Sequence, residues 1–100
     1  MINLNISLND LKKIQNPNII DIRTIENYNN NHMPGAKNIP YNNLLTSPEK
    51  YLNKIEKYYI YCKHGKTSTS LCKILNKLGY RTYSINGGYE EWILNAYNEQ

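Results

Sequence analysis

The stretch from residue 58 to residue 79 limits most strongly what this chain can fold into. Tyr58-Tyr59-Ile60-Tyr61 has the aromatic and β-branched composition of a buried strand, and it runs directly into the loop Cys62-Lys63-His64-Gly65-Lys66-Thr67-Ser68. A helix is predicted to follow, because apolar residues recur there at helical spacing, namely Leu71, Ile74, Leu75 and Leu78. Gly79 is placed to end that helix. A strand that leads through a short loop into a helix is typical of an α/β protein.

The same alternation covers the rest of the chain. Strands are predicted at 2–6, 19–22, 37–39 and 82–85 from their apolar residues. Helical segments are predicted at 8–14, with Ser7 as N-cap, and at 26–30, 41–45, 48–55 and 89–96. Strands separated by helices predict a small, mainly parallel central sheet of about five strands with helices on both faces. One hundred residues are expected to form a single domain, 1–100.

Charge and cysteine content exclude several classes of protein. The net charge is +4, but the ten lysines are spread along the chain and arginine occurs twice, which favours a solvated surface over a nucleic-acid patch. No stretch approaches the roughly 20 apolar residues of a membrane span. Residues 1–7 show no secretory signal, so a reducing cytosol is the predicted compartment. Cys62 and Cys72 are too far apart for a disulfide, and the cysteines and histidines lack metal-ligand spacing.

Cys62 is the candidate nucleophile, because the predicted fold places it where a parallel strand ends and a helix begins. Ligands bind at that edge of an α/β sheet. The helix N-terminus favours anions, and Gly65 allows the loop amides to turn inward as an anion-binding nest. Lys63 and Lys66 add positive charge. We therefore expect a lowered Cys62 pKa and nucleophilic chemistry with an anionic substrate or intermediate.

Two hydroxyl residues and a second cysteine complete this region. Thr67 and Ser68 follow the loop and add hydrogen-bond donors that can also cap the helix. Cys72 lies beside the apolar face of the helix without a basic cluster, so we expect it to pack in the core. For Cys62 the competing interpretation is also a buried structural cysteine, placed by chance at the end of a strand.

Five segments of the chain resemble, in order, the motifs of the rhodanese family of sulfurtransferases. They are Ile20-Asp21-Ile22-Arg23, His32-Met33-Pro34-Gly35-Ala36-Lys37-Asn38-Ile39-Pro40, Tyr61-Cys62-Lys63-His64-Gly65-Lys66-Thr67-Ser68, Leu78-Gly79-Tyr80 and Asn86-Gly87-Gly88-Tyr89-Glu90-Glu91-Trp92. Each motif is short, but their order and spacing extend the resemblance over nearly the whole chain. The resemblance implies a small, mainly parallel sheet flanked by helices, in agreement with the fold predicted from the residue pattern.

The resemblance also implies an activity, that of a thiosulfate sulfurtransferase-like enzyme without a cofactor or metal. Cys62 would take the outer sulfur of a small anionic donor such as thiosulfate, become a persulfide, and pass that sulfur to cyanide, a thiol or a protein in a ping-pong reaction. The implied substrate-binding loop comprises Lys63, His64, Gly65, Lys66, Thr67 and Ser68. Lys63 stands where the similar thiosulfate-type loop has arginine, so the charge is kept and the planar fork is lost.

Four other residues are candidates for structural roles, and two of them have more than one interpretation. Asp21 and Arg23 end a strand at the same edge, where they either orient the loop, meet the substrate, or form a structural ion pair or turn cap. His32 precedes a turn and is expected to be a hydrogen-bonded structural histidine, while Trp92 is expected in the core.

Two further functions remain as alternatives. One is a protein-to-protein persulfide carrier or a regulatory module with little thiosulfate activity. The other is a cysteine phosphatase or arsenate reductase-like enzyme, which needs Cys-x5-Arg, whereas this chain has Ser68 at that position.

Overall fold

The computed structural model describes residues 3–98, in which five strands form one sheet. The strands are β1 (Asn5–Ile6), β2 (Asn18–Asp21), β3 (Lys37–Asn38), β4 (Lys57–Tyr61) and β5 (Arg81–Ile85). Their order in the sheet is β1-β5-β4-β2-β3, and each neighbouring pair is parallel. The predicted α/β fold class is confirmed. The strand predicted at 2–6 is reduced to β1, and Ile2 lies outside the described residues.

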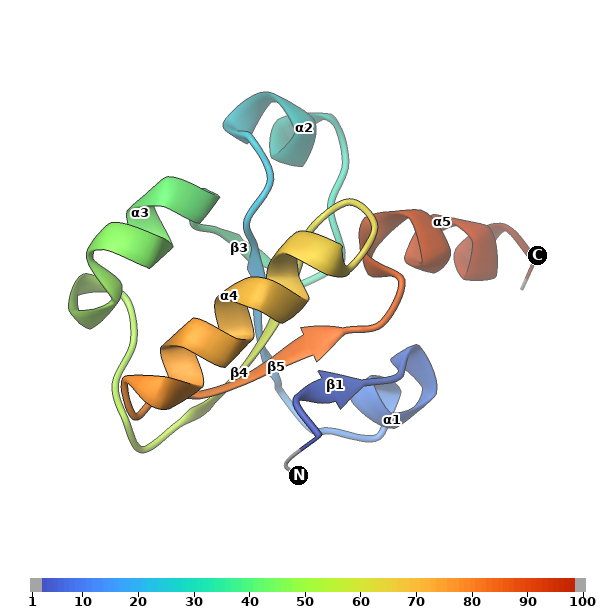
Figure 1. The fold of residues 1–100 in the computed structure, drawn as a ribbon. Helices are drawn as coiled ribbons and strands as arrows, with labels where there is room; N and C mark the ends of the chain where they lie inside the picture. The colour runs from blue at the N-terminus through green and yellow to red at the C-terminus, as the bar shows by residue number, and fades with distance from the viewer. Residues whose placement is uncertain (1–2, 99–100) are drawn as a thin grey trace.

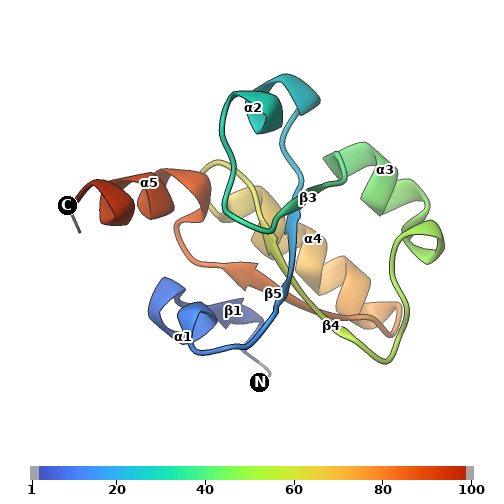
Figure 2. The same cartoon turned by 180° about the vertical axis from the view of Figure 1, so that it is seen from behind.

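Helices cover both faces of the sheet, as predicted. They are α1 (Leu8–Lys12), α2 (Ile25–Asn30), α3 (Tyr41–Thr46), the 3-10 turn η1 (Pro48–Lys50), α4 (Lys66–Lys77) and α5 (Gly88–Asn98). In Figure 1 the gold helix α4 crosses in front of the sheet, and in Figure 2 the view from behind brings α1 and α5 to the front. Within residues 3–98 no helix is long and apolar enough to span a bilayer.

Strand β4 shows why the sheet carries two apolar layers. Successive side chains of a strand point to opposite faces. Tyr58 and Ile60 pack into one buried cluster, together with residues of α3 and α4, while Tyr59 and Tyr61 pack into another with residues of α1. All four side chains are buried. The end of β4 is therefore fixed from both sides, which holds the residue that follows it, Cys62, in a defined place.

Two helix ends form as the sequence predicts. The Ser7 hydroxyl accepts the Asp10 N–H at 3.0 Å and caps α1. Gly79 adopts a φ of +100° after α4, and the Tyr80 N–H then donates to the Leu75 carbonyl at 3.0 Å. This left-handed glycine ends the helix by satisfying one of its last carbonyls.

The helix predicted at 48–55 is wrong beyond its first turn. Pro48 begins η1, which ends at Lys50. The Asn53 side chain then accepts the N–H groups of Ile55 and Glu56 at 3.0 and 2.8 Å. An asparagine that bonds nearby backbone N–H groups competes with helical hydrogen bonding, so the chain turns here instead of continuing the helix.

The buried face of α4 is also rotated from the predicted one. Leu71 and Leu75 are fully buried, but Ile74 and Leu78 are 40% and 50% exposed. The buried residues of this helix are Ser68, Leu71, Cys72 and Leu75. The helix is turned so that the small polar residue at its start, rather than an additional apolar residue, faces the sheet.

Candidate active site

Cys62 directly follows β4 and precedes α4 by one short loop. Strand β4 lies between β2 and β5 in the middle of the sheet, so Cys62 lies at the central carboxyl end of the parallel strands. Ligand sites of open parallel sheets occur at this edge. The Cys62 residue is only 8% exposed.

Loop amides converge on the Cys62 sulfur. The Gly65 N–H donates to Sγ at 3.1 Å and the Ser68 N–H donates at 3.3 Å. The Ser68 hydroxyl oxygen lies 3.4 Å from the same sulfur. Backbone N–H groups arranged around one point at a helix N-terminus favour a negative charge there.

Gly65 allows the loop to adopt this shape. Its φ is +103°, in the left-handed region that residues with a Cβ rarely adopt. A Cβ at this position would also lie 3.1 Å from the backbone nitrogen of Gly87. The glycine is therefore needed both for the turn and for the close approach of the segment before α5.

The ionisation of Cys62 reflects these contacts. Burial raises its pKa, but hydrogen bonds from the Ser68 hydroxyl and from the backbone of Ser68, Gly65 and His64 outweigh burial, so the pKa of Cys62 is lowered from the ordinary thiol value. These hydrogen bonds, rather than lysine charges, account for the lowering. A lowered pKa means a larger thiolate fraction at neutral pH, and the thiolate is the nucleophile.

The predicted loop residues divide into two groups. Gly65 and Ser68 are buried and contact the sulfur. The others are exposed around the loop, namely Lys63, His64, Lys66 and Thr67. The His64 Nδ1 atom lies 3.1 Å from the Glu90 carboxylate, so this histidine is held toward α5. The exposed Lys63 and Lys66 add positive charge to the surface of the loop.

The start of α5 holds the loop from the other side, a role that the sequence analysis did not assign. The Tyr89 N–H donates to the Cys62 carbonyl at 2.9 Å, and the Glu90 N–H donates to the Lys63 carbonyl at 3.0 Å. A Cβ on Gly88 would lie 2.4 Å from the Cys62 carbonyl oxygen. The Gly87-Gly88 pair in the sequence was the available signal, because adjacent glycines permit close backbone approach.

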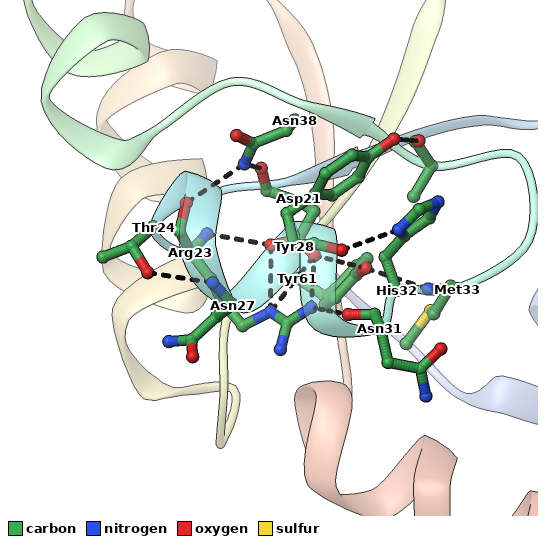
Figure 3. A network of polar contacts seen from close by, with 11 residues as sticks. Asp21, Arg23, Thr24, Asn27, Tyr28, Asn31, His32, Met33, Asn38 and Tyr61 are labelled. Carbon is green, nitrogen blue, oxygen red and sulfur yellow. Dashed lines mark hydrogen bonds and ion pairs between the residues drawn. The ribbon is translucent and has the colours of Figure 1, made fainter.

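Asp21, which is fully buried, forms an ion pair with the partly buried Arg23 (Figure 3). The Arg23 Nη2 atom donates to Asp21 Oδ2 at 2.7 Å, and the Arg23 backbone N–H donates to Asp21 Oδ1 at 2.8 Å. The Tyr61 hydroxyl also donates to Asp21 at 2.6 Å. Of the interpretations given above for Asp21 and Arg23, the structure thus shows the structural ion pair and the turn cap.

The same network reaches the loop through neighbours of Cys62. Tyr61 directly precedes Cys62, and the Arg23 guanidinium lies 3.9 Å from the centre of the Tyr89 ring. Since the Tyr89 N–H bonds the Cys62 carbonyl, Arg23 supports one of the groups that hold the loop. Burial raises the pKa of Tyr61, which keeps its hydroxyl protonated as a donor to Asp21.

Three other expectations concern structural residues. His32 stacks on Tyr28 with ring centres 3.8 Å apart, and its Nδ1 lies 2.8 Å from the Tyr28 carbonyl oxygen, as expected for a structural histidine. Trp92 is half-buried and packs against the cluster that contains Tyr59 and Tyr61. Cys72 is fully buried, and burial raises its pKa to about 12.

Comparison with known proteins decides the family. The sequence pattern of the Rhodanese-like domain matches residues 7–95. The chain belongs to this family. It is 32% identical over 75 residues to the thiosulfate sulfurtransferase GlpE of Tolumonas auensis, a match that covers 74% of this chain and 70% of that protein.

Two further matches show the extent of the similarity. The adenylyltransferase and sulfurtransferase uba4 of Ogataea parapolymorpha is 30% identical over 88 residues, which is 87% of this chain but 23% of that longer protein. The crystal structure of a rhodanese-related protein from Thermoplasma volcanium superposes with a TM-score of 0.82 at 27% identity and covers 91% of each chain. The observed fold is therefore the one that the resemblance implied.

The rhodanese-like loop differs from a phosphatase loop at one decisive position. Phosphatase chemistry places an arginine six residues after the cysteine, where its guanidinium grips the oxyanion. In this domain that residue is Ser68, whose side chain is buried beside the Cys62 sulfur. The site thus presents backbone amides and one hydroxyl to a single sulfur atom rather than an arginine fork.

Proposed function

We propose that this rhodanese-like domain is a sulfurtransferase that carries a sulfane sulfur on Cys62. It takes the sulfur from a small anionic donor such as thiosulfate and passes it to a thiophilic acceptor, which is cyanide, a thiol or a protein. The observation that carries the proposal is the pair of N–H groups, from Gly65 and Ser68, that point at the Cys62 sulfur. A reducing compartment such as the cytosol keeps this cysteine free for reaction, and we propose that the domain works there.

The reaction has two balanced steps. The Cys62 thiolate attacks the outer sulfur of thiosulfate, a new S–S bond forms, and the old S–S bond breaks as sulfite leaves with the electron pair. In the second step the acceptor attacks the outer sulfur of the persulfide, and the Cys62 thiolate leaves. The enzyme ends in its starting state, so the transfer needs no cofactor.

The loop supports each anion on this path. Amides that stabilise a thiolate also stabilise the negative charge of a persulfide, because both lie at the N-terminus of α4. Lys63 and Lys66 are exposed beside the buried sulfur, where their charges attract an anionic donor. A lysine ammonium is a point charge rather than a bidentate fork, so the donor is attracted by charge more than it is gripped in one orientation.

Sulfur loading tests the proposal directly. The intact protein is incubated with thiosulfate, and separately with a protein persulfide donor, and its mass is measured. We expect the mass of one sulfur atom to be added, and peptide mapping to place it on Cys62. Loading by the protein donor alone would make the domain a protein-to-protein carrier and would overturn the thiosulfate assignment.

The second cysteine provides the matched control. Cys62→Ser should abolish loading, whereas Cys72→Ala should retain it, because the Cys72 thiol is fully buried and its pKa is raised by burial to about 12. Equal loading of the wild type and the Cys62→Ser variant would refute the proposal.

A further inference from the structure

Three hydroxyl groups lie in a connected cluster behind the Cys62 sulfur. Ser68 Oγ is 3.4 Å from the sulfur and 2.7 Å from Ser84 Oγ on β5. Thr69 Oγ1 lies 3.1 Å from Ser84 Oγ and 2.7 Å from the Gly65 carbonyl oxygen. The chain of contacts therefore runs from the sulfur to a strand that does not belong to the loop.

Ser68 and Ser84 are both fully buried. A buried hydroxyl lowers stability unless it is hydrogen-bonded, so the cluster must be satisfied in each ionisation state of Cys62. Each serine has one proton to donate and can accept bonds at its oxygen. The directions of these bonds are therefore limited by the number of protons.

With Cys62 as a thiol, the cluster has a consistent arrangement. The thiol donates to Ser68 Oγ, and the Ser68 hydroxyl donates to the Gly65 carbonyl, 3.1 Å away. Ser68 then needs nothing from Ser84, because it already accepts one bond and donates another. The Ser68 hydroxyl can also donate to Ser84 Oγ instead, because the Gly65 carbonyl still accepts the Thr69 hydroxyl at 2.7 Å, so in this state the short contact between the two serines can run in either direction.

With Cys62 as a thiolate, the directions are fixed. The sulfur has no proton, so the Ser68 hydroxyl must turn and donate to it. The Gly65 carbonyl remains satisfied by the Thr69 hydroxyl at 2.7 Å. Ser68 can no longer donate to Ser84, so the 2.7 Å contact requires Ser84 to donate to Ser68. The thiol proton leaves to solvent, while the three hydroxyl groups keep their own protons and rotate.

We propose that Ser84 is a positioning residue that holds the Ser68 hydroxyl in the direction that donates to the Cys62 sulfur when that sulfur is anionic. Hydrogen bonds in a chain polarise one another, so a donation from Ser84 strengthens the bond from Ser68 to the sulfur. This inference deepens the proposed function, since it concerns the same sulfur, but it can be tested without any sulfur donor.

The test is the pH dependence of Cys62 alkylation by iodoacetamide, with peptide mapping to isolate Cys62. Ser84→Ala should move the midpoint of the rate to higher pH and lower the rate at neutral pH by about threefold to tenfold, since the thiolate loses a supporting donor and the thiol does not. Thr82→Val is the matched control, because it also removes a fully buried hydroxyl from β5, one that contacts Asn76 and Cys72 instead. Its midpoint should equal that of the wild type.

A double variant tests the route of the effect. Ser84 acts through Ser68, so Ser68→Ala and the double variant Ser68→Ala/Ser84→Ala should have the same midpoint. Thr69→Val provides a second single variant: the Gly65 carbonyl keeps the Thr69 backbone N–H but loses the hydroxyl at 2.7 Å, so it competes more strongly with the sulfur for the Ser68 hydroxyl, and the midpoint should also rise. Circular dichroism checks that each variant is folded.

An unchanged midpoint in folded Ser84→Ala, an equal shift in Thr82→Val, or additive shifts in the double variant would each overturn the proposal. If wild-type Cys62 takes no sulfur from any donor while Ser84→Ala still moves the midpoint, the proposed function fails and the role of Ser84 stands. If sulfur loading is normal but the Ser84→Ala midpoint is unchanged, the proposed function stands and the role of Ser84 fails.

Discussion

The two cysteines of this chain lie on either side of the start of α4. The pKa of the Cys62 thiol is lowered from the ordinary value, whereas that of the Cys72 thiol is raised. Both residues are buried, which by itself raises a thiol pKa. For Cys62 the hydrogen bonds of the loop reverse that effect, and for Cys72 burial dominates. At the scale of the residue, the direction of a few N–H and O–H groups therefore decides which cysteine can react.

Asp21 shows the same principle for a carboxylate. It is fully buried and accepts hydrogen bonds from Arg23 and Tyr61. Asp21→Asn keeps the shape but leaves the guanidinium without its counter-charge, so we expect a loss of about 3 kcal/mol in the free energy of unfolding, measured with urea. Asp10→Asn, which breaks the exposed pair with Lys13, should cost less than about 1 kcal/mol. Comparable losses in both variants would contradict this account of the buried pair.

At the scale of the element, α4 and α5 each serve the loop with their first residues. Ser68 belongs to the buried face of α4, and this explains why the observed buried face of that helix is rotated from the predicted one. The apolar pattern alone assigned Ile74 and Leu78 to the core, because a serine carries no hydrophobic signal. Only the position of the sulfur explains why a polar residue faces the sheet there.

Gly88 at the start of α5 offers a test of how the loop is held. Gly88→Ala would place a Cβ 2.4 Å from the Cys62 carbonyl oxygen, so α5 must move away and the loop must lose its support. We expect sulfur loading of Cys62 to fall roughly tenfold or more, because small displacements of a reacting group are costly.

Gly35→Ala is the matched control for that variant. Gly35 also has a positive φ, +82°, but a Cβ there would meet nothing within 4 Å. It should cost only the backbone strain of about 1–2 kcal/mol and leave loading at the wild-type level. If both glycine variants load sulfur equally, the contact between the start of α5 and the loop has no functional role.

At the scale of the whole molecule, the order of strands brings the site together. Strand β4, the middle strand of the sheet, ends at Tyr61, directly before Cys62, while β5 beside it supplies Ser84 and β2 on the other side ends at Asp21. The alternation of strands and helices predicted this layout, because parallel strands all end at one edge. Cys62, Gly65 and the helix after them were therefore placed correctly from the sequence.

Other parts of the site needed the structure. The support of the loop by Tyr89 and Glu90, and the contact between Ser68 and Ser84, join segments that are far apart in the sequence. Side-chain direction and strand register set such contacts, and neither follows from residue periodicity. The turn at Asn53 was missed for a local reason, since its side chain replaces helical hydrogen bonds that the pattern had suggested.

The central claim is that the loop amides hold a negative charge on the Cys62 sulfur. The pH dependence of the alkylation rate of wild-type Cys62, followed by peptide mapping, measures that charge most directly. The account predicts a midpoint below the value of about 8.5 for a free thiol, because the hydrogen bonds of the loop lower the pKa. A midpoint at or above that value would contradict it.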